Sequence, residues 1–315
     1  MTDIELAILH EIPNGNVQFN TLYNPILEYN SNEYLLTEIK RDQIRLEKLL
    51  GNGAFGMVFQ GKVKNLETPG TEIPVAIKKL RKNASSQEKK KFLEEARLMN
   101  HFRHKHVLRL LAVCLDEDSP LIVSKFATIR FACSASAGFV RHVRRCCSRC
   151  CYLENLRFVH RDLACRNCLV SARDRENRIV KIGDFGLARD VYKTDYYRKK
   201  GQGLLPICWM APESLVIGIF TSQSDVWSFG VLMWEITSLG EHPYVGRTNL
   251  EVIDYVRAGG RLPMPLNCPP TLYELMLRCW SPLSNDRPNF KLCLENIIAL
   301  RNNIEDTLLS SVDIV

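Results

Sequence analysis

The sequence predicts an α+β fold of two lobes, in which a small five-stranded antiparallel sheet with one helix precedes a larger, mainly helical lobe. Three observations predict it. Alternating apolar residues and glycines dominate the chain before about residue 125, helical spacing dominates after residue 150, and a strongly apolar helix lies within the second part. The cleft between two such lobes is where we expect a ligand to bind.

The strands of the small lobe are predicted by short alternating segments separated by turn residues. Ile44 to Leu49 alternates like a half-buried strand, a second strand opens at Val58 after a run of glycines, and Pro74 to Lys78 forms a third. This order of strands and turns favours antiparallel pairing. Two further strands are expected at 107–113 and 121–124.

Helices are predicted by capping residues and by the spacing of apolar residues. A capping box at 85–88 opens a helix whose apolar positions recur over 92–102. Residues 225–234 are apolar nearly all round, so that helix is expected to be buried on every side. Two more helices are expected at 271–280 and 289–301.

Charge and composition indicate an ordinary globular protein. The chain carries 42 Lys and Arg against 35 Asp and Glu, and this net charge of +7 suits either phosphate-bearing partners or a mildly basic surface. No apolar run reaches the roughly 20 residues that cross a bilayer, and the first residues lack the basic region of a signal peptide. We therefore expect a cytosolic domain whose parent protein would carry any membrane span upstream.

The 12 cysteines are scattered, apart from a local cluster at 146, 147, 150 and 151. Reduced thiols are favoured over a metal site, because cytosolic cysteines usually stay reduced and no second ligand pair stands at zinc-ligand spacing.

The segment His160 to Asn167, followed by Asp184-Phe185-Gly186, is the most informative feature of the sequence. Asp162 can accept a proton from an attacking hydroxyl and orient it. Asn167 and Asp184 offer amide and carboxylate oxygens, which are the hard ligands that Mg²⁺ prefers. Phosphoryl transfer depends on positioning and charge neutralisation, and these side chains supply both. The order of the motifs disfavours the alternative, a set of ordinary loop carboxylates.

A glycine-rich turn and a strand lysine complete the candidate phosphate site. Gly51-x-Gly53-x-x-Gly56-x-Val58 lies between two strands, whereas the glycines of a Rossmann turn open a helix. The context favours a flap that approaches phosphates closely, with a simple hairpin turn as the alternative. Lys78 ends a buried strand and has Glu95 as its candidate partner; a solvated strand-end lysine is the alternative.

These motifs resemble those of receptor tyrosine kinases, most closely the sevenless/ROS group. The resemblance covers about residues 40–126 and 152–302. It implies the bilobal protein-kinase fold and transfer of the γ-phosphate of ATP to protein tyrosine hydroxyls. The segments that carry it are Gly51 to Gly56, Val75 to Lys78, Phe92 to Ala96, His160 to Asn167, Asp184 to Gly186, Ala211 to Glu213 and Ser224 to Gly230.

The resemblance implies a role for each matching residue, with ATP and Mg²⁺ as cofactors. The residues expected to be catalytic are Asp162, Arg166, Lys78 and Glu95. The expected metal ligands are Asn167 and Asp184. The residues expected to bind ATP are Gly51, Asn52, Gly53, Ala54, Phe55, Gly56, Val58, Ala76, Lys78, Lys125, Ala127 and Leu169. Glu213 and Arg287 are expected to form a buried structural ion pair, with a surface Arg287 as the alternative.

Two features favour tyrosine over serine as the acceptor. The catalytic loop reads Leu163-Ala164-Cys165-Arg166-Asn167, which looks like the tyrosine-kinase form, and Arg166 would help to place the phenol there. Leu204-Leu205-Pro206 resembles the platform on which such kinases rest the substrate ring. A tyrosine hydroxyl lies farther from its backbone than a serine hydroxyl does, so a different platform is required.

Tyr192, Tyr196 and Tyr197 have the spacing of insulin-receptor-like activation loops, which predicts three regulatory phosphosites; a merely exposed polar loop is the alternative. Phosphorylation adds about −1.5 to −2 charges to each, which nearby arginines and lysines would pair with. The implied partners are protein substrates with tyrosine, a second copy for trans-phosphorylation and phosphotyrosine-binding adaptors, and no nucleic acid. The implied parent is a single-pass receptor of the plasma membrane.

Residues 125–151 depart from the family pattern, because they are shortened, basic and rich in cysteine. Four arginines stand where an apolar stripe would pack the helix before the catalytic loop, and burying them unpaired would be costly. An exon loss or a reading-frame error that ends at Tyr152 would explain the departure. A catalytically impaired pseudokinase or scaffold is therefore the alternative function. Cys208 departs too, since relatives usually carry a basic residue there.

These observations divide the chain into five parts. They are a flexible juxtamembrane-like leader at 1–40, the N-lobe at 41–124, the aberrant shortened hinge and helix region at 125–151, the C-lobe at 152–303 and a tail at 304–315.

Overall fold

The structure is a computed structural model. It describes residues 36–53, 56–101, 108–115, 119–125, 139–170, 180–182, 189–190, 197–198 and 205–312.

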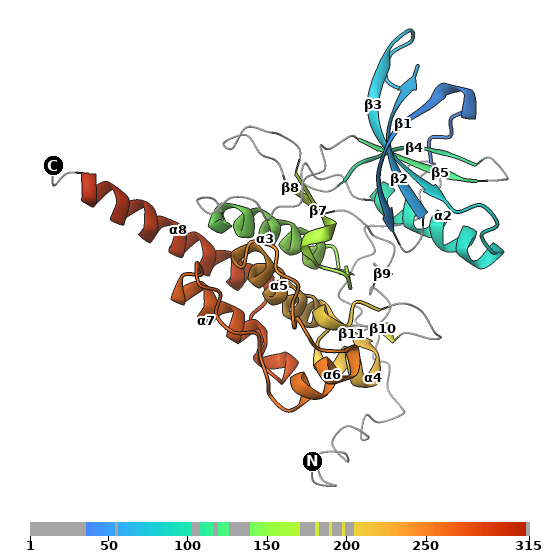
Figure 1. Cartoon of the computed structure of the whole chain (residues 1–315). Helices are drawn as coiled ribbons and strands as arrows, with labels where there is room; N and C mark the ends of the chain where they lie inside the picture. Colours follow the sequence, from blue (N-terminus) through green and yellow to red (C-terminus); the bar gives the residue numbers. More distant parts are fainter. Residues whose placement is uncertain are drawn as a thin grey trace, which may run out of the picture. The chain divides into compact units, whose positions relative to one another are not determined.

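The N-lobe is the five-stranded antiparallel sheet that the sequence predicts, drawn in blue to green in Figure 1. Its strands, in the order β1-β2-β3-β5-β4, are β1 (Ile44–Gly53), β2 (Gly56–Lys64), β3 (Glu72–Leu80), β4 (Leu110–Cys114) and β5 (Leu121–Lys125). A short 3-10 turn, η1 (Arg41–Gln43), precedes β1, and the one helix, α2 (Ser86–His101), lies beside the sheet. The prediction of five strands and one helix is confirmed.

Alternation along β3 gives the sheet two different faces. Val75 and Ile77 enter one apolar cluster with Val63 of β2 and Val123 of β5. Residues between and after them point to the opposite face, where Leu80 packs with residues of α2. Because Lys78 follows Ile77 directly, this alternation turns the side chain of Lys78 toward α2.

Helix α2 begins with the predicted capping box. The Ser85 N–H donates to Glu88 Oε2 at 2.8 Å, and the Glu88 N–H donates back to Ser85 Oγ at 3.3 Å. Phe92, Ala96 and Met99 then form the buried face of the helix, at the spacing of successive turns.

The C-lobe is mainly helical, as predicted. Its helices are α3 (Phe139–Asn155), α4 (Pro212–Ile217), α5 (Ser222–Thr237), α6 (Asn249–Arg257), α7 (Pro270–Cys279) and α8 (Phe290–Val312). Its short strands are β6 (Phe158–Val159), β7 (Cys168–Val170), β8 (Val180–Ile182), β9 (Arg189–Asp190), β10 (Tyr197–Arg198) and β11 (Ile219–Phe220). Its 3-10 turns are η2 (Cys165–Asn167), η3 (Ile207–Trp209) and η4 (Ser284–Asp286).

Helix α5 is the centre of the C-lobe. Every residue from Ser224 to Thr237 is buried, and α7 and α3 pack against this helix. The prediction of burial on every side is confirmed, as are the helices expected near the positions of α7 and α8. Helix α8 continues through Val312, so no break separates the predicted tail at 304–315 from the preceding helix. Among the described residues, no helix is both long and apolar enough to cross a membrane.

Helix α3 occupies much of the segment expected to be aberrant. Its buried apolar positions are Val143, Cys146, Cys147, Cys150 and Leu153, which recur at helical spacing, and His142 and Arg149 are buried beside them. Cysteine is a small apolar side chain when buried, so the thiols form the stripe that packs the helix. Of the four arginines of this helix, only Arg149 is fully buried, and burial lowers the pKa of its guanidinium. Arg144 and Arg145 are partly buried, and burial lowers the pKa of the Arg145 guanidinium too. The predicted burial cost is therefore largest for Arg149, smaller for Arg144 and Arg145, and absent for the exposed Arg141.

Gly230 allows α5 to pack closely against the C-terminal end of α7 and against Trp280, the residue that follows α7. A Cβ at this position would lie 2.5 Å from Nε1 of Trp280 and 3.1 Å from Cβ of Cys279. Because both neighbours are buried, the contact has little room to relax.

Replacing Gly230 with Ala is expected to lower the free energy of unfolding by about 1–3 kcal/mol, the usual cost of overpacking a core. Urea unfolding checks this, with Glu274→Ala at an exposed position of α7 as the control. If the Gly230→Ala variant were as stable as the control, α5 and α7 could move apart to accommodate the methyl group with no loss in the free energy of unfolding, and the prediction would be wrong.

Candidate active site

The predicted catalytic loop brings Asp162, Arg166 and Asn167 together. Asn167 Nδ2 donates to Asp162 Oδ2 at 2.9 Å and to the Asp162 carbonyl oxygen at 2.8 Å. The Arg166 guanidinium donates to the other carboxylate oxygen of Asp162. Both oxygens of the carboxylate are thereby held in place, and its side chain remains 15% exposed, so it is open to a reacting group.

Two buried carboxylates of α5 hold this loop from below. Asp225 accepts the N–H groups of His160 at 2.6 Å and Arg161 at 2.8 Å. Glu235 Oε2 accepts the Cys165 N–H at 2.9 Å. Arg161 has a φ of 70°, a region that residues other than glycine rarely adopt, and the bond to Asp225 secures that conformation.

Sequence reasoning missed the roles of Asp225 and Glu235, although a signal was present. Both are carboxylates in a helix that is otherwise apolar all round, and a buried charge needs partners. Trp209 also belongs to this arrangement, because its Nε1 donates to Glu235 Oε2 at 2.9 Å. The Arg166 guanidinium lies 4.2 Å from the centre of the Trp209 ring. Arg166 is thus fixed both by Asp162 and by a ring anchored on α5.

Burial raises the pKa of Asp225 from its ordinary value of 3.8 to about 7. Desolvation outweighs the two backbone N–H groups, which favour the charged form. The folded state therefore binds more protons than the unfolded state between these two pKa values. The free energy of unfolding is expected to decrease as the pH rises through this window, by up to about 1.4 kcal/mol per pH unit.

Urea unfolding of the wild type and of Asp225→Asn between about pH 4.5 and 7.5 measures this contribution. The downward slope is expected to be clearly smaller in the variant, where Glu235, whose pKa burial also raises, still contributes, whereas Asp254→Asn, at an exposed position of α6, retains the full slope. Equal slopes in all three proteins would contradict the assignment.

The predicted contact between Lys78 and Glu95 is present. Lys78 Nζ lies 2.7 Å and 2.8 Å from the two carboxylate oxygens of Glu95. The side chains are 14% and 4% exposed, so the pair is largely withdrawn from water. The ammonium group is held in one position at the end of β3 by the helix that packs on this face of the sheet.

The glycine-rich turn joins β1 to β2, so the predicted strand–turn–strand context is confirmed. Gly53 pairs with Gly56 across the turn. Gly56 has a φ of 154°, and a Cβ there would lie 2.2 Å from the Lys79 carbonyl oxygen, so only glycine fits. Val58 lies directly opposite Lys78, and Ala76 lies two residues before it, so these three residues share one face of the sheet.

Several predicted site residues lie outside the described part of the chain. They are Ala54, Phe55, Ala127, Asp184, Tyr192, Tyr196 and Leu204. For another group only the backbone is described, namely Gly51, Asn52, Gly53, Leu169 and Tyr197. Lys125 is the exposed last residue of β5. The roles expected of these residues remain predictions.

The orientation of the Asn167 side-chain amide is compatible with the expected cation site. Both of its hydrogen bonds to Asp162 use Nδ2. The amide oxygen is therefore the atom left to ligate a cation, and an amide oxygen is a hard ligand of the kind that divalent ions take in proteins.

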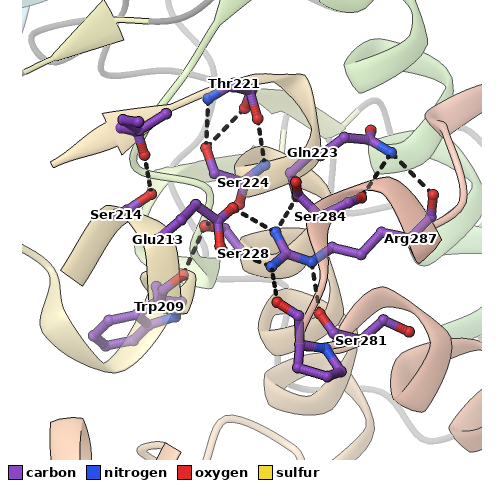
Figure 2. A network of polar contacts seen from close by, with 12 residues as sticks. Trp209, Glu213, Ser214, Thr221, Gln223, Ser224, Ser228, Ser281, Ser284 and Arg287 are labelled. Atoms are coloured by element: carbon purple, nitrogen blue, oxygen red, sulfur yellow. Dashed lines mark hydrogen bonds and ion pairs between the residues drawn. The ribbon is translucent and has the colours of Figure 1, made fainter. Parts of the chain in front are cut away.

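The predicted ion pair between Glu213 and Arg287 is bidentate, with the arginine fully buried and the glutamate partly buried (Figure 2). Arg287 Nη1 lies 2.6 Å from Glu213 Oε1, and Nη2 lies 2.8 Å from Oε2. The guanidinium also donates to the carbonyl oxygens of Ser281 and Gln223, at 2.9 Å and 3.0 Å. The Arg287 side chain is 0% exposed, so the alternative of a surface arginine is wrong. The pair links α4 to the segment before α8, and Gln223 of α5 reinforces it through the Arg287 carbonyl at 2.9 Å.

Residues 205–209 lie beside this network. Leu205 and Pro206 lead into η3, whose Trp209 is anchored by Glu235 as described above. The Ser228 hydroxyl of α5 donates to the Trp209 carbonyl oxygen at 2.7 Å. Cys208, the second departure from the family pattern, is half-buried in this turn, and burial raises the pKa of its thiol.

Comparison with known proteins assigns the family. The model of the protein tyrosine and serine/threonine kinases matches residues 44–297. The transforming protein ros of UR2 avian sarcoma virus, a tyrosine-protein kinase, is 47% identical over 81% of this chain and 68% of its own length. The proto-oncogene tyrosine-protein kinase ROS of Homo sapiens is 45% identical over 88% of the chain, and the protein sevenless of Drosophila melanogaster is 45% identical over 88%.

The chain spans 13% of the human protein and 12% of the fly protein, so it corresponds to one domain of much longer relatives. The bilobal arrangement expected from the sequence, with an antiparallel five-stranded sheet and a helical region, agrees with the family match. The chain belongs to the protein kinase family and carries a protein-tyrosine kinase domain of the ROS and sevenless type.

Proposed function

We propose that this domain transfers the γ-phosphate of ATP to tyrosine hydroxyls of protein substrates, with Asp162 as the catalytic residue that orients the phenol. The observation that carries the proposal is the geometry of the catalytic loop. The Asp162 carboxylate is held by Asn167 and Arg166, on a loop whose backbone is bonded to two carboxylates of the central helix. A carboxylate fixed in this way is positioned before the substrate arrives.

Each remaining residue has a role in positioning or in charge neutralisation. Asp162 accepts the phenolic proton as the hydroxyl attacks the γ-phosphorus in line. Lys78, kept in place by Glu95, neutralises phosphate oxygens of ATP. Arg166, fixed over the ring of Trp209, borders the place where the substrate ring would rest. The glycine turn between β1 and β2 approaches the phosphates, and Val58 and Ala76 line the face that receives the base.

Asn167 and Asp184 would hold a divalent ion, for which we propose Mg²⁺. When bound, such an ion neutralises the charge that develops on the phosphate oxygens. The family requires ATP and a divalent metal. The orientation of the Asn167 amide supports its part in this site.

We also propose that phosphorylation of Tyr192, Tyr196 and Tyr197 regulates the domain, through trans-phosphorylation between two copies, and that adaptors bind the phosphotyrosines. The parent protein would be a single-pass receptor of the plasma membrane. The relationship to ROS and sevenless supports both proposals.

The alternative, an impaired pseudokinase, was motivated by the departure at residues 125–151. In the described part of that segment, helix α3 has a buried apolar stripe, and the loop after it has its anchoring bonds. Nothing in the comparisons favours the alternative.

Phosphate transfer to a tyrosine peptide, with ATP and Mg²⁺, tests the proposal. Lys78→Met is expected to lose activity by about two orders of magnitude or more, because a charge clamp on the phosphates is removed. Lys79→Met, at the adjacent position on the other face of β3, serves as the matched control and is expected to stay active. Incorporation into a serine peptide at an equal rate, or equal activity in both variants, would contradict the proposal.

A further inference from the structure

Two buried thiols on separate elements face each other beneath the catalytic loop. The Cys146 Sγ of α3 lies 3.9 Å from the Cys168 Sγ, at the start of β7. Both residues are at most 2% exposed. Cys168 directly follows Asn167, so one member of the pair adjoins the end of the catalytic loop.

Cys146 differs in its surroundings from the other close thiols. The hydrogen bond with Cys168 and the charge of the Arg149 guanidinium lower the pKa of the Cys146 thiol, whereas the same bond and burial raise the pKa of its partner Cys168. Cys279 and Cys293 are also 3.9 Å apart, but burial raises the pKa of Cys279 well above its ordinary value. Cys147, the neighbour of Cys146, donates to the Phe290 carbonyl oxygen at 3.4 Å and interacts with Cys151 of the same helix, and burial raises its pKa well above the ordinary value.

We propose that Cys146 and Cys168 form a redox-active dithiol, which peroxide converts to a disulfide that inactivates the kinase. The Cys146 sulfur attacks one oxygen of hydrogen peroxide, the O–O bond breaks, and a sulfenic acid forms while the first water leaves with the former thiol proton. The Cys168 sulfur then attacks the Cys146 sulfur. The S–O bond breaks, and the departing oxygen takes the Cys168 proton as the second water. Two thiols lose two electrons, and peroxide gains them.

Closing this bond must move the start of β7. A disulfide requires the sulfurs to approach to about 2.05 Å, which is well short of the present separation. Helix α3 is packed on both α5 and α8, so the shift falls mainly on the short strand β7 and on Asn167 before it. Asn167 holds Asp162 through two hydrogen bonds, so the shift misplaces the proposed catalytic carboxylate.

Burial determines which oxidants reach the pair. A molecule as small as hydrogen peroxide enters during local opening of the fold, whereas bulky disulfides and alkylating reagents are excluded. Oxidation of this pair is therefore expected to be slower than oxidation of an exposed thiol. The disulfide itself, and not the rate at which thiols are lost, identifies the reaction.

Peptide mapping after treatment with hydrogen peroxide tests the pairing without any measurement of activity. Trypsin cleaves after Arg145, Arg149 and Arg166, so the bond appears as a linkage between peptide 146–149 and the peptide that starts at Asn167. Cys146→Ser is expected to abolish this linkage. Cys147→Ser, the matched control in the same peptide, is expected to leave it unchanged.

A further variant examines the role of the buried arginine. Arg149→Met is expected to slow the linkage, roughly tenfold for each unit by which the Cys146 pKa rises. Chymotryptic peptides replace tryptic ones for this variant because a cleavage site is lost.

The activity readout rests on the proposed function. Oxidation is expected to lower the kcat of the wild type by on the order of a hundredfold, as for a catalytic group displaced by about 1 Å. Dithiothreitol is expected to restore it, and Cys146→Ser should keep its activity after peroxide. A linkage that forms without loss of activity would overturn the switch, and absence of the linkage, or its formation first between Cys279 and Cys293, would overturn the dithiol itself. A domain that is inactive before oxidation would instead contradict the proposed function and leave the mapping result standing.

Discussion

Replacing Asp162 with Asn is expected to lower kcat for tyrosine phosphorylation by about 10²–10⁴-fold, the usual contribution of a positioned proton acceptor. An asparagine has nearly the same shape, and its one amide oxygen can accept the hydrogen bond from Asn167 while the bond from Arg166 is lost. Its neutral amide does not take the phenolic proton. The KM for ATP is expected to change little, because the proposed phosphate contacts come from Lys78 and the glycine turn. Steady-state kinetics with a tyrosine peptide measures both constants.

Two controls separate a chemical defect from a folding defect. Asp286→Asn, at an exposed position of η4, should have wild-type kinetics. The thermal unfolding midpoint of Asp162→Asn should remain close to that of the wild type, since a partly exposed carboxylate is replaced by a similar amide. An Asp162→Asn protein that is folded and fully active would remove the central residue from the proposed mechanism.

The catalytic loop shows how far sequence reasoning reaches. Asp162, Arg166 and Asn167 were predicted as a group because they lie within one short segment, and local spacing keeps such residues close. The contact of Lys78 with Glu95 was also predictable, since one residue ends a buried strand and the other lies on the next helix. The support from Asp225 and Glu235 was not predicted, because it depends on how α5 lies beneath the loop.

Helix α3 is a case in which the expectation holds only in part. Four arginines and a cysteine cluster were interpreted as a break in the helix-packing pattern. Counting cysteine as a small apolar residue restores that pattern at Val143, Cys146, Cys147 and Cys150. Arg149 is fully buried, Arg144 and Arg145 are partly buried, and Arg141 is exposed, so the expected burial of arginines is confirmed in part.

Helix α6 was missed although its start carried a signal. Thr248 and Glu251 form a capping box, with the Thr248 N–H donating to Glu251 Oε2 at 2.7 Å. The same reasoning that found the start of α2 applies here. The helix is short, and only Val252 and Val256 are buried, so its apolar period is too brief to stand out.

Replacing Arg287 with Met is expected to lower the free energy of unfolding by about 3–5 kcal/mol, which is the cost of removing one partner of a buried ion pair. The Glu213 carboxylate would lose both of its bonds to the guanidinium, and the carbonyl oxygens of Ser281 and Gln223 would lose a donor. Since domains are stable by only about 5–15 kcal/mol, the variant should unfold at a much lower urea concentration. Fluorescence reports it directly, because the Arg287 guanidinium lies 5.1 Å from the Trp227 ring centre.

A double-mutant cycle separates the ion pair from the packing of the arginine. Glu213→Met alone leaves the Arg287 charge buried, so it too should be strongly destabilising, whereas Glu213→Met with Arg287→Met leaves no unpaired charge. The double variant should therefore be more stable than the sum of the two single losses predicts. Arg278→Met, at an exposed position of α7, controls for loss of a surface charge. If the losses in the free energy of unfolding were strictly additive, Glu213 and Arg287 would stabilise the lobe independently of each other. The bonds from Arg287 to carbonyl oxygens, and not its bond to the Glu213 carboxylate, would then account for its contribution.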